Sequence, residues 1–116
     1  MIIDLASDYF PYPSGRFTSD GTYNGERFRT EVLVPALRAA KAAGGSEKVV
    51  IDIDGVRSFG SSFLEEAFGG LVRRGLFSRG DLSSLLEIRC TKPHLFMFRD
   101  LIGSYIDSAQ ADLKVG

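Results

Sequence analysis

The sequence is poor in the residues that build disulfide frameworks and metal sites. It has one cysteine, Cys90, one histidine, His94, and no tryptophan. A single cysteine excludes an internal disulfide, and one cysteine with one histidine leaves too few soft ligands for a zinc site. We therefore expect no metal and no cofactor, and a reducing compartment, the cytoplasm, suits the chain.

The sequence also lacks a surplus of positive charge and any long apolar run. Fourteen basic residues stand against fifteen acidic ones, which gives a formal net charge of −1. No bulk positive field would then attract nucleic acid. The apolar runs are about five residues long, far below the roughly 20 that span a bilayer, and no basic segment followed by an apolar run opens the chain. We expect neither a membrane nor a nucleic-acid partner.

What is present fits one α/β domain over residues 1–116. The chain has 44% hydrophobic residues and 25% charged residues, as in an ordinary globular protein. Three apolar runs predict strands, and each is followed by a stretch with helical spacing. This βαβαβα order predicts a small, mainly parallel or mixed sheet of about four strands, covered by helices in two or three layers. The expected strands are 1–5, 48–54 and 85–90, and the expected helices are 26–43, 61–76 and 93–113.

Prolines and glycines mark particular points in the expected helices. Asn24 is a candidate N-cap for the first helix. Pro35 lies inside that helix and predicts either a kink or a fresh start with the proline in the first turn. Gly69 and Gly70 each cost the second helix about 1 kcal/mol relative to alanine. Close approach of another backbone or of a partner would explain the pair, and so would a bend.

The segment VVIDIDGVRSFGSSFLEE joins a buried strand to a helix start through a short turn. In open α/β sheets, ligand sites lie beyond the carboxyl ends of the strands, and a helix start offers unpaired N–H groups. Ser61 and Ser62 are placed at this junction. Ser62 and Glu65 also match the Ser-x-x-Glu capping box, which is a purely structural role.

This segment resembles the signature of STAS domains, the fold of bacterial anti-sigma-factor antagonists. Residues 51–56 match the family's strand, and Ser61, Ser62 and Leu64 match its helix start. IRCTKPHLFMFRDLIG is similar to the family's last strand, Pro-containing turn and helix. Gly60 and Phe63 depart from the family's Asp and Gly at their positions. The N-terminal loop and FRTEVLVPALRAA look closer to a STAS-like family without an assigned activity.

The resemblance implies a non-enzymatic, cytoplasmic, bacterial regulatory module that binds a protein. In the family's antagonists the first serine of the pair is phosphorylated by an ATP-binding anti-sigma or histidine-kinase-like partner, and Ser61 is the matching residue. ATP would belong to that partner. The implied partner-binding residues are Gly60, Ser61, Ser62, Phe63, Glu65 and Glu66. A phosphate on Ser61 adds about −1.5 to −2 charges, which we expect Asp52, Asp54, Glu65 and Glu66 to oppose.

Two further interpretations remain open. The arginines of the N-terminal segment, Arg16, Arg27 and Arg29, are candidates for anion recognition, because guanidinium groups bind carboxylates and phosphates in a bidentate manner. With Asp52 and Asp54 they would serve a small-ligand or phosphate-binding domain, or an enzyme. A solvated charged face explains the same residues. A domain that builds homo-oligomers is the third possibility.

Overall fold

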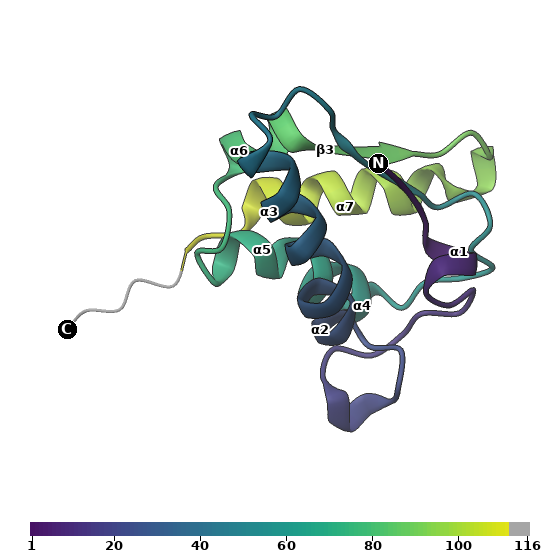
Figure 1. Ribbon diagram of the computed structural model, residues 1–116. Coiled ribbons are helices and arrows are strands. Elements are labelled where there is room, and N and C mark those ends of the chain that lie inside the picture. The colour runs from purple at the N-terminus through teal and green to yellow at the C-terminus, as the bar shows by residue number, and fades with distance from the viewer. Residues whose placement is uncertain (112–116) are drawn as a thin grey trace.

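The computed structural model describes residues 1–111 and contains a three-stranded sheet with helices packed on one side of it (Figure 1). The strands are β1 (Ile2–Asp4), β2 (Val49–Asp52) and β3 (Leu86–Arg89). Both strand pairs are parallel, and the order across the sheet is β1-β2-β3. The α/β class and the parallel pairing expected from the sequence are confirmed. The sheet has three strands where about four were expected.

Both connections between strands run in the same direction across the sheet. Right-handed crossovers therefore place both connecting segments on one face. The first contains α2 (Gly25–Phe28), a π-helical segment η2 (Arg29–Leu33) and α3 (Val34–Ala42), which form one continuous helix over residues 25–42. The second contains α4 (Ser61–Leu64), the π-helical η3 (Glu65–Gly69) and α5 (Gly70–Arg73), continuous over 61–73, and then α6 (Arg79–Leu85).

The remaining elements are short helices and one longer one. After β1 comes α1 (Leu5–Asp8), and the long loop that follows contains η1 (Thr18–Asp20). After β3, η4 (Pro93–Leu95) leads into α7 (Phe96–Ser108). The helix expected over 93–113 ends at Ser108, because Ala109 is extended and residues 109–111 are not helical. Its last two expected residues, 112 and 113, lie outside the described part of the chain. No helix within residues 1–111 is long and apolar enough to cross a membrane.

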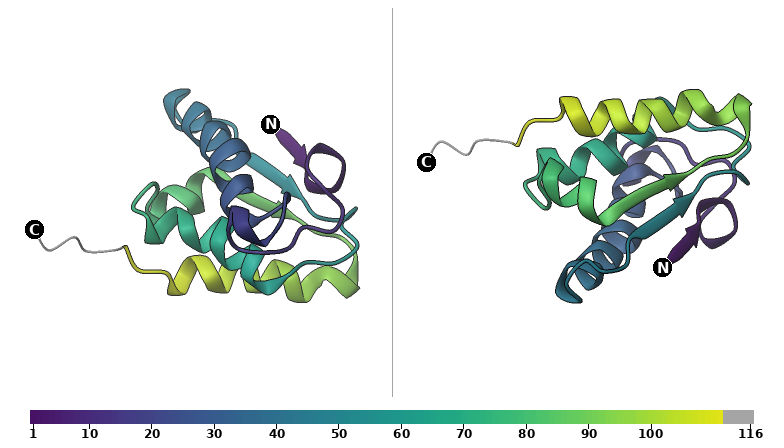
Figure 2. Two further views of the ribbon diagram at one scale, coloured as in Figure 1. Left: turned by 90° about the horizontal axis from the view of Figure 1, so that it is seen from below. Right: turned by 90° about the horizontal axis from the view of Figure 1, so that it is seen from above.

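Side chains alternate between the two faces of the sheet as the strand period requires. Ile3, Val49 and Ile51 are buried against the helices, whereas Ile2 is 57% exposed on the opposite face. Seen from above, no helix crosses over the described strands (Figure 2, right). The fold is thus a two-layer arrangement with one covered and one open sheet face. The core between the layers is rich in aromatic rings, among them Phe28, Phe63 and Phe68.

Local sequence signals explain where the first helix begins and how it passes Pro35. The Asn24 side chain accepts a hydrogen bond from the Arg27 N–H, so it is the N-cap expected from the sequence. Pro35 lies in the first turn of α3, directly after η2. Leu33 and Val34 keep helical backbone angles and no side chain caps Leu33, so the helix runs on through the proline and the fresh start expected as one of two outcomes is not found.

Candidate functional site

We call the continuous helix over residues 25–42 the first long helix and the continuous helix over 61–73 the second long helix. The candidate site begins where the chain leaves β2 and enters the second long helix. Gly60 is the N-cap residue in extended conformation, and its carbonyl accepts hydrogen bonds from the N–H groups of Phe63 and Leu64. Ser61 is exposed and Ser62 is half-buried. The serine pair thus faces outward at a helix start, as the junction in the sequence predicted.

The capping box predicted for Ser62 and Glu65 does not form. Ser62 is the second helical residue, because Gly60 occupies the cap, and no side chain caps this end of the helix. The Glu65 carboxylate instead binds Arg16 and Arg73. The prediction is wrong because the helix begins earlier than the pattern implied, which places Ser62 within the helix and not at the N-cap that a capping box requires.

The N-terminal loop packs against the segment that leads to Ser61. The N–H of Arg57 donates to the Pro11 carbonyl at 2.8 Å, and the N–H of Gly60 donates to the Pro13 carbonyl at 3.1 Å. A Cβ atom on Gly60 would lie 3.3 Å from both Cα and Cβ of Ser14. The absence of a side chain at Gly60 therefore permits the loop to lie directly beside the helix start.

Two glutamates of the second long helix form an ion-pair network with three arginines. Arg16 binds Glu65 and also donates to Glu66 Oε1 at 3.0 Å. Arg73 binds Glu65 and donates to Glu66 Oε1 at 3.0 Å. Arg29 donates to Glu66 Oε2 and, at 2.7 Å, to the Glu66 carbonyl. The network joins the N-terminal loop, the first long helix and the second long helix.

Burial differs sharply across this network. The Arg29 and Glu66 side chains are 2% and 4% exposed, whereas Arg16 and Arg73 are about one-third exposed. Removing two charges from water is costly unless they are paired and hydrogen-bonded. The Arg29–Glu66 pair is therefore the interior part of the network, and Arg16 lies at its solvent edge, where it holds the N-terminal loop.

The glycine pair of the second helix provides room for this network. A Cβ on Gly70 would lie 2.5 Å from Arg29 Nη1, and a Cβ on Gly69 would lie 2.7 Å from Glu65 Oε2 and 3.4 Å from the Tyr105 carbonyl of α7. The close approach of another backbone expected for this glycine pair is found at Gly69, beside the α7 carbonyl. At Gly70 the approaching group is a guanidinium.

The network lowers the pKa of both glutamates. Burial of Glu66 favours the neutral acid, but the hydrogen bonds from Arg29 and Arg16 and the nearby positive charges outweigh it, so the net pKa falls below its ordinary value. The same balance of burial against Arg16 and Arg73 lowers the pKa of Glu65. Both side chains are therefore carboxylates at neutral pH.

Arg27, Asp52 and Asp54 were also expected in an anion-binding or acidic site. In the structure each of them contacts other residues of the chain. Arg27 forms an ion pair with Glu31 at 3.2 Å, and its guanidinium lies 5.4 Å from the centre of the Tyr23 ring. Asp52 accepts the N–H of Asp54 at 2.9 Å. Asp54 in turn accepts the N–H and hydroxyl of Thr91, both at 2.7 Å. Asp54 thus connects the loop after β2 to the loop after β3.

The implied partner-binding residues fall into exposed and buried groups. Phe63 is fully buried, with its ring against Phe28 and Phe59, and Glu66 is buried beneath Arg29. The accessible part of the segment is therefore Gly60, Ser61, Ser62 and one side of Glu65. We refer to these four residues as the serine surface.

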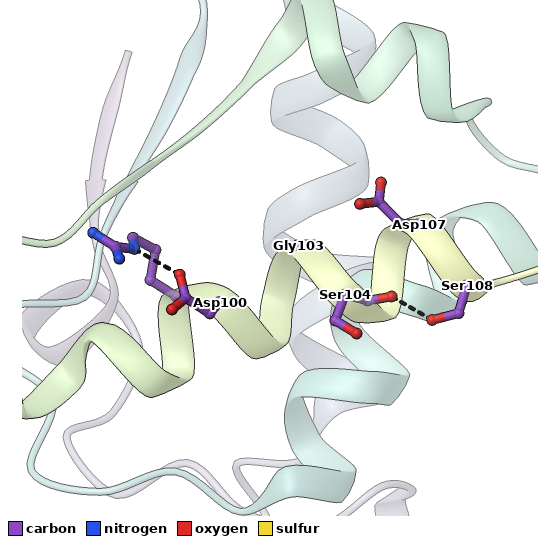
Figure 3. Close-up of a pocket in the computed structure, with 6 residues that line it drawn as sticks. Asp100, Gly103, Ser104, Asp107 and Ser108 are labelled. Carbon is purple, nitrogen blue, oxygen red and sulfur yellow. Dashed lines mark hydrogen bonds and ion pairs between the residues drawn. The ribbon is translucent and has the colours of Figure 1, made fainter.

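Other parts of the described chain offer no obvious centre for chemistry. Within residues 1–111, no group of three His, Cys, Asp or Glu side chains is arranged to hold a metal ion. A shallow depression on α7 is lined by Arg99, Asp100, Gly103, Ser104, Asp107 and Ser108. Its polar side chains point in different directions, and Ser108 donates to the Ser104 carbonyl of its own helix (Figure 3). They do not converge on a common point.

The family comparison adds one finding to this geometry. A family model described as a STAS-like domain of unknown function (DUF4325) matches residues 24–93, which is more than half of the chain. The chain belongs to this STAS-like family. The matched region contains the serine surface, Arg29, both glutamates and Arg73, and Arg16 lies outside it. No curated protein and no solved structure matches the chain.

Membership of the STAS-like family confirms the resemblance read from the strand, turn and helix around Ser61. One functional feature was missed in the sequence, namely the role of Arg73. A signal was present, because Arg73 follows Glu65 by eight residues and Glu66 by seven, about two helical turns. The burial of Arg29 had no comparable signal, since it depends on contact between two helices distant in sequence.

Proposed function

We propose that this STAS-like domain is a non-enzymatic regulatory module that binds a protein partner through the serine surface, and that phosphorylation of Ser61 controls the binding. One observation carries the proposal. Ser61 is an exposed residue at the first position of a helix that a buried strand and a docked loop hold in place. A kinase can reach such a residue without unfolding the domain.

The helix start is compatible with a phosphate. The first N–H groups of a helix lack partners in the helix, and the partial positive charge there favours an anion. The new group would add about −1.5 to −2 charges at neutral pH. The modified domain would therefore remain folded, and the change would act on whatever docks against the surface.

The expected repulsion within the chain needs revision. Glu65 and Glu66 are each paired with arginines, and Asp52 and Asp54 accept hydrogen bonds from neighbouring groups. These carboxylates oppose a phosphate on Ser61 less than four free charges would. We therefore propose that the phosphate acts on partner binding. The contacting groups of the partner would face a doubly charged phosphate in place of a neutral hydroxyl.

Arg16 supplies a second route by which the phosphate would act. Glu65 follows Ser61 by four residues, so both lie on the same side of the helix, and Arg16 binds Glu65 from the N-terminal loop. A phosphate on Ser61 would compete for the Arg16 guanidinium, because guanidinium groups bind phosphate strongly. Phosphorylation would then also move the N-terminal loop beside the serine surface.

The partner we propose is an ATP-binding anti-sigma or histidine-kinase-like protein, by analogy with the antagonists whose serine Ser61 matches. The domain itself would need no cofactor, and ATP would be bound by the partner. No observation favours the alternative of a small-ligand or phosphate-binding domain or an enzyme. The guanidinium groups of Arg16 and Arg29 already donate to Glu65 and Glu66.

Purification of the tagged chain from its native cells, after mild cross-linking, tests the proposal. Trypsin releases residues 58–73 as one peptide, because Arg57 and Arg73 bound a stretch without lysine or arginine. We expect that peptide to carry one phosphoryl group on Ser61, and we expect an ATP-binding protein to co-purify with the unmodified form. An unmodified peptide under all growth conditions would contradict the switch.

Variants at Ser61 then test the direction of the switch. Ser61→Ala should retain the co-purified protein, and Ser61→Asp should weaken binding by about tenfold or more, equivalent to about 1.4 kcal/mol. Ser104→Asp, which adds the same charge at an exposed site on α7, is the matched control. Equal loss of binding in both aspartate variants would show a general charge effect and would contradict the proposal.

A further inference from the structure

The outer edge of β3 has no neighbouring strand within residues 1–111. β3 is the last strand in the order β1-β2-β3. The Arg89 carbonyl accepts the Ile53 N–H and so points toward β2. Because successive residues of a strand point their backbone groups to opposite sides, the N–H and C=O of Ile88 point away from the sheet. An unpaired edge of this kind is a template for another strand.

Helix α7 lies where a fourth strand would need support. It runs back alongside β3 on the side away from β2 when the molecule is seen from above, and it lies below β3 in the front view (Figures 1 and 2). A groove of about 270 Å³ separates the two elements and reaches α6. Its apolar walls are formed by Leu82, Leu86, Ile88, Ile102 and Ile106.

Gly103 leaves open space on the α7 side of this groove. It lies in the interior of α7, is exposed, and a Cβ built on it would meet no atom within 4 Å. A glycine in a helix interior costs about 1 kcal/mol relative to alanine. At Gly69 and Gly70 the absence of a side chain allows close contacts within the chain. No such contact is found for Gly103 within the described residues, so we look for a group from another molecule.

Charged side chains mark the two ends of the groove. Arg99 lies in the first turn of α7, next to the carboxyl end of β3, and Arg79 opens α6, which leads into the other end of β3. Arg99 donates to Asp100 at 3.1 Å, and Arg79 donates to the backbone carbonyl of Asp107 at 2.6 Å. The groove residues thus comprise two guanidinium groups and one carboxylate, that of Asp107.

We propose that the groove between β3 and α7 binds an extended segment of a partner protein, which adds to the sheet as a fourth strand. The backbone of that segment would pair with Ile88, and every second side chain would point down onto α7 near Gly103. The groove selects apolar residues at those positions and an acidic residue near the end formed by Arg79, which donates to a backbone carbonyl, whereas Arg99 already pairs with Asp100. This mode of recognition combines backbone hydrogen bonds for affinity with side-chain pockets for specificity.

A displayed library of random heptapeptides, panned against the full-length immobilised chain, tests the proposal. We expect enriched peptides with apolar residues at every second position and at least one aspartate or glutamate. Gly103→Phe, which fills the groove, should weaken binding of a synthetic enriched peptide by about tenfold or more, or about 1.4 kcal/mol. Ser104→Phe is the matched control, because Ser104 is exposed on α7 and does not line the groove.

A second measurement does not depend on any protein variant. Single N-methylation of the peptide at successive positions removes one backbone N–H at a time. Only alternate N–H groups of an added strand face Ile88, so we expect loss of binding at every second position. Ser61→Asp should leave peptide binding unchanged, which separates this groove from the serine surface.

Four results would overturn the proposal. The first is a library without enrichment, the second is peptide binding that Gly103→Phe leaves intact, and the third is N-methylation that weakens binding without alternation. The fourth is a wild-type dimer, seen by sedimentation and dissociated by Gly103→Phe, because a second copy of the chain would then occupy the edge of β3.

Discussion

Arg29 and Glu66 form a buried ion pair that joins the π-helical segment of one long helix to the π-helical segment of the other. π-Helical turns are rare and occur frequently at functional sites. Here they carry the two charged residues into the space between the helices, and Gly70 leaves room for the guanidinium. The pair therefore fixes the relative placement of the helix that starts at Ser61 and the helix that follows the N-terminal loop.

Removing one member of this pair should destabilise the fold strongly. Glu66→Gln leaves the Arg29 charge buried without its carboxylate, and such changes cost about 3–5 kcal/mol. The double variant Arg29→Met with Glu66→Met removes both charges, so its loss should be smaller than the sum of the losses in the single variants Arg29→Met and Glu66→Met. Urea unfolding of wild type, these two single variants and the double variant measures this coupling, and strictly additive losses would show that the two charges do not interact.

The same network predicts the response of stability to acid. Folding lowers the pKa of Glu65 and Glu66 from the ordinary value of 4.5. Their contribution is therefore complete above the unfolded-state pKa and is lost as pH falls through the lower folded-state pKa. Wild-type stability should be nearly constant from pH 7 to about pH 5 and should decline below that pH. Glu66→Gln should show a shallower decline, and an unchanged slope would contradict the assignment.

Two glycine-to-alanine changes should have opposite effects. Gly70→Ala places a Cβ at 2.5 Å from Arg29 Nη1 and must displace the guanidinium, so it should lower the free energy of unfolding. Gly103→Ala meets open space in α7 and should raise it by about 0.5–1 kcal/mol through helix propensity. Thermal or urea unfolding distinguishes the two, and stabilisation by Gly70→Ala would show that Arg29 does not need that space.

Loss of Arg16 should loosen the N-terminal loop without unfolding the domain. The N–H of Gly25 bonds to the Gly15 carbonyl, and the N–H of Glu26 bonds to the Arg16 carbonyl, both at 3.0 Å. Arg16→Ala removes the ion pair that holds this loop on Glu65, so hydrogen exchange at these two amides should become faster. Arg38→Ala, on the exposed side of α3, is the control, and equal exchange in the two variants would contradict a holding role for Arg16.

Local patterns in the sequence were sufficient for the order of the main strands and helices and for their parallel pairing. They also predicted the Asn24 cap and the close approach of another backbone at Gly69. They did not reveal α6, although Ser78 and Asp81 form a capping box at its start. The spacing of Leu82 and Leu85 was the remaining signal, and it is too short to indicate a helix by itself.

The features that sequence reasoning missed depend on contacts between distant residues. Glu65 pairs with Arg16 across 49 residues and does not take part in the expected local capping box. The sequence indicates a surface or anion-binding role for Arg29, whereas its burial follows from packing of the first long helix on Glu66. The π-helical turns have no recognised local pattern in the sequence. In each case tertiary packing prevailed over local preference.

Site-specific photo-cross-linking in living cells tests the central claim most directly. A photoreactive residue in place of Ser62 reports what docks on the serine surface, and the same residue in place of Ser104 serves as the control. The account predicts a cross-link from position 62 to an ATP-binding protein, absent at position 104 and lost when Ser61 is also changed to aspartate. A cross-link that Ser61→Asp leaves unchanged, or none at position 62, would contradict it.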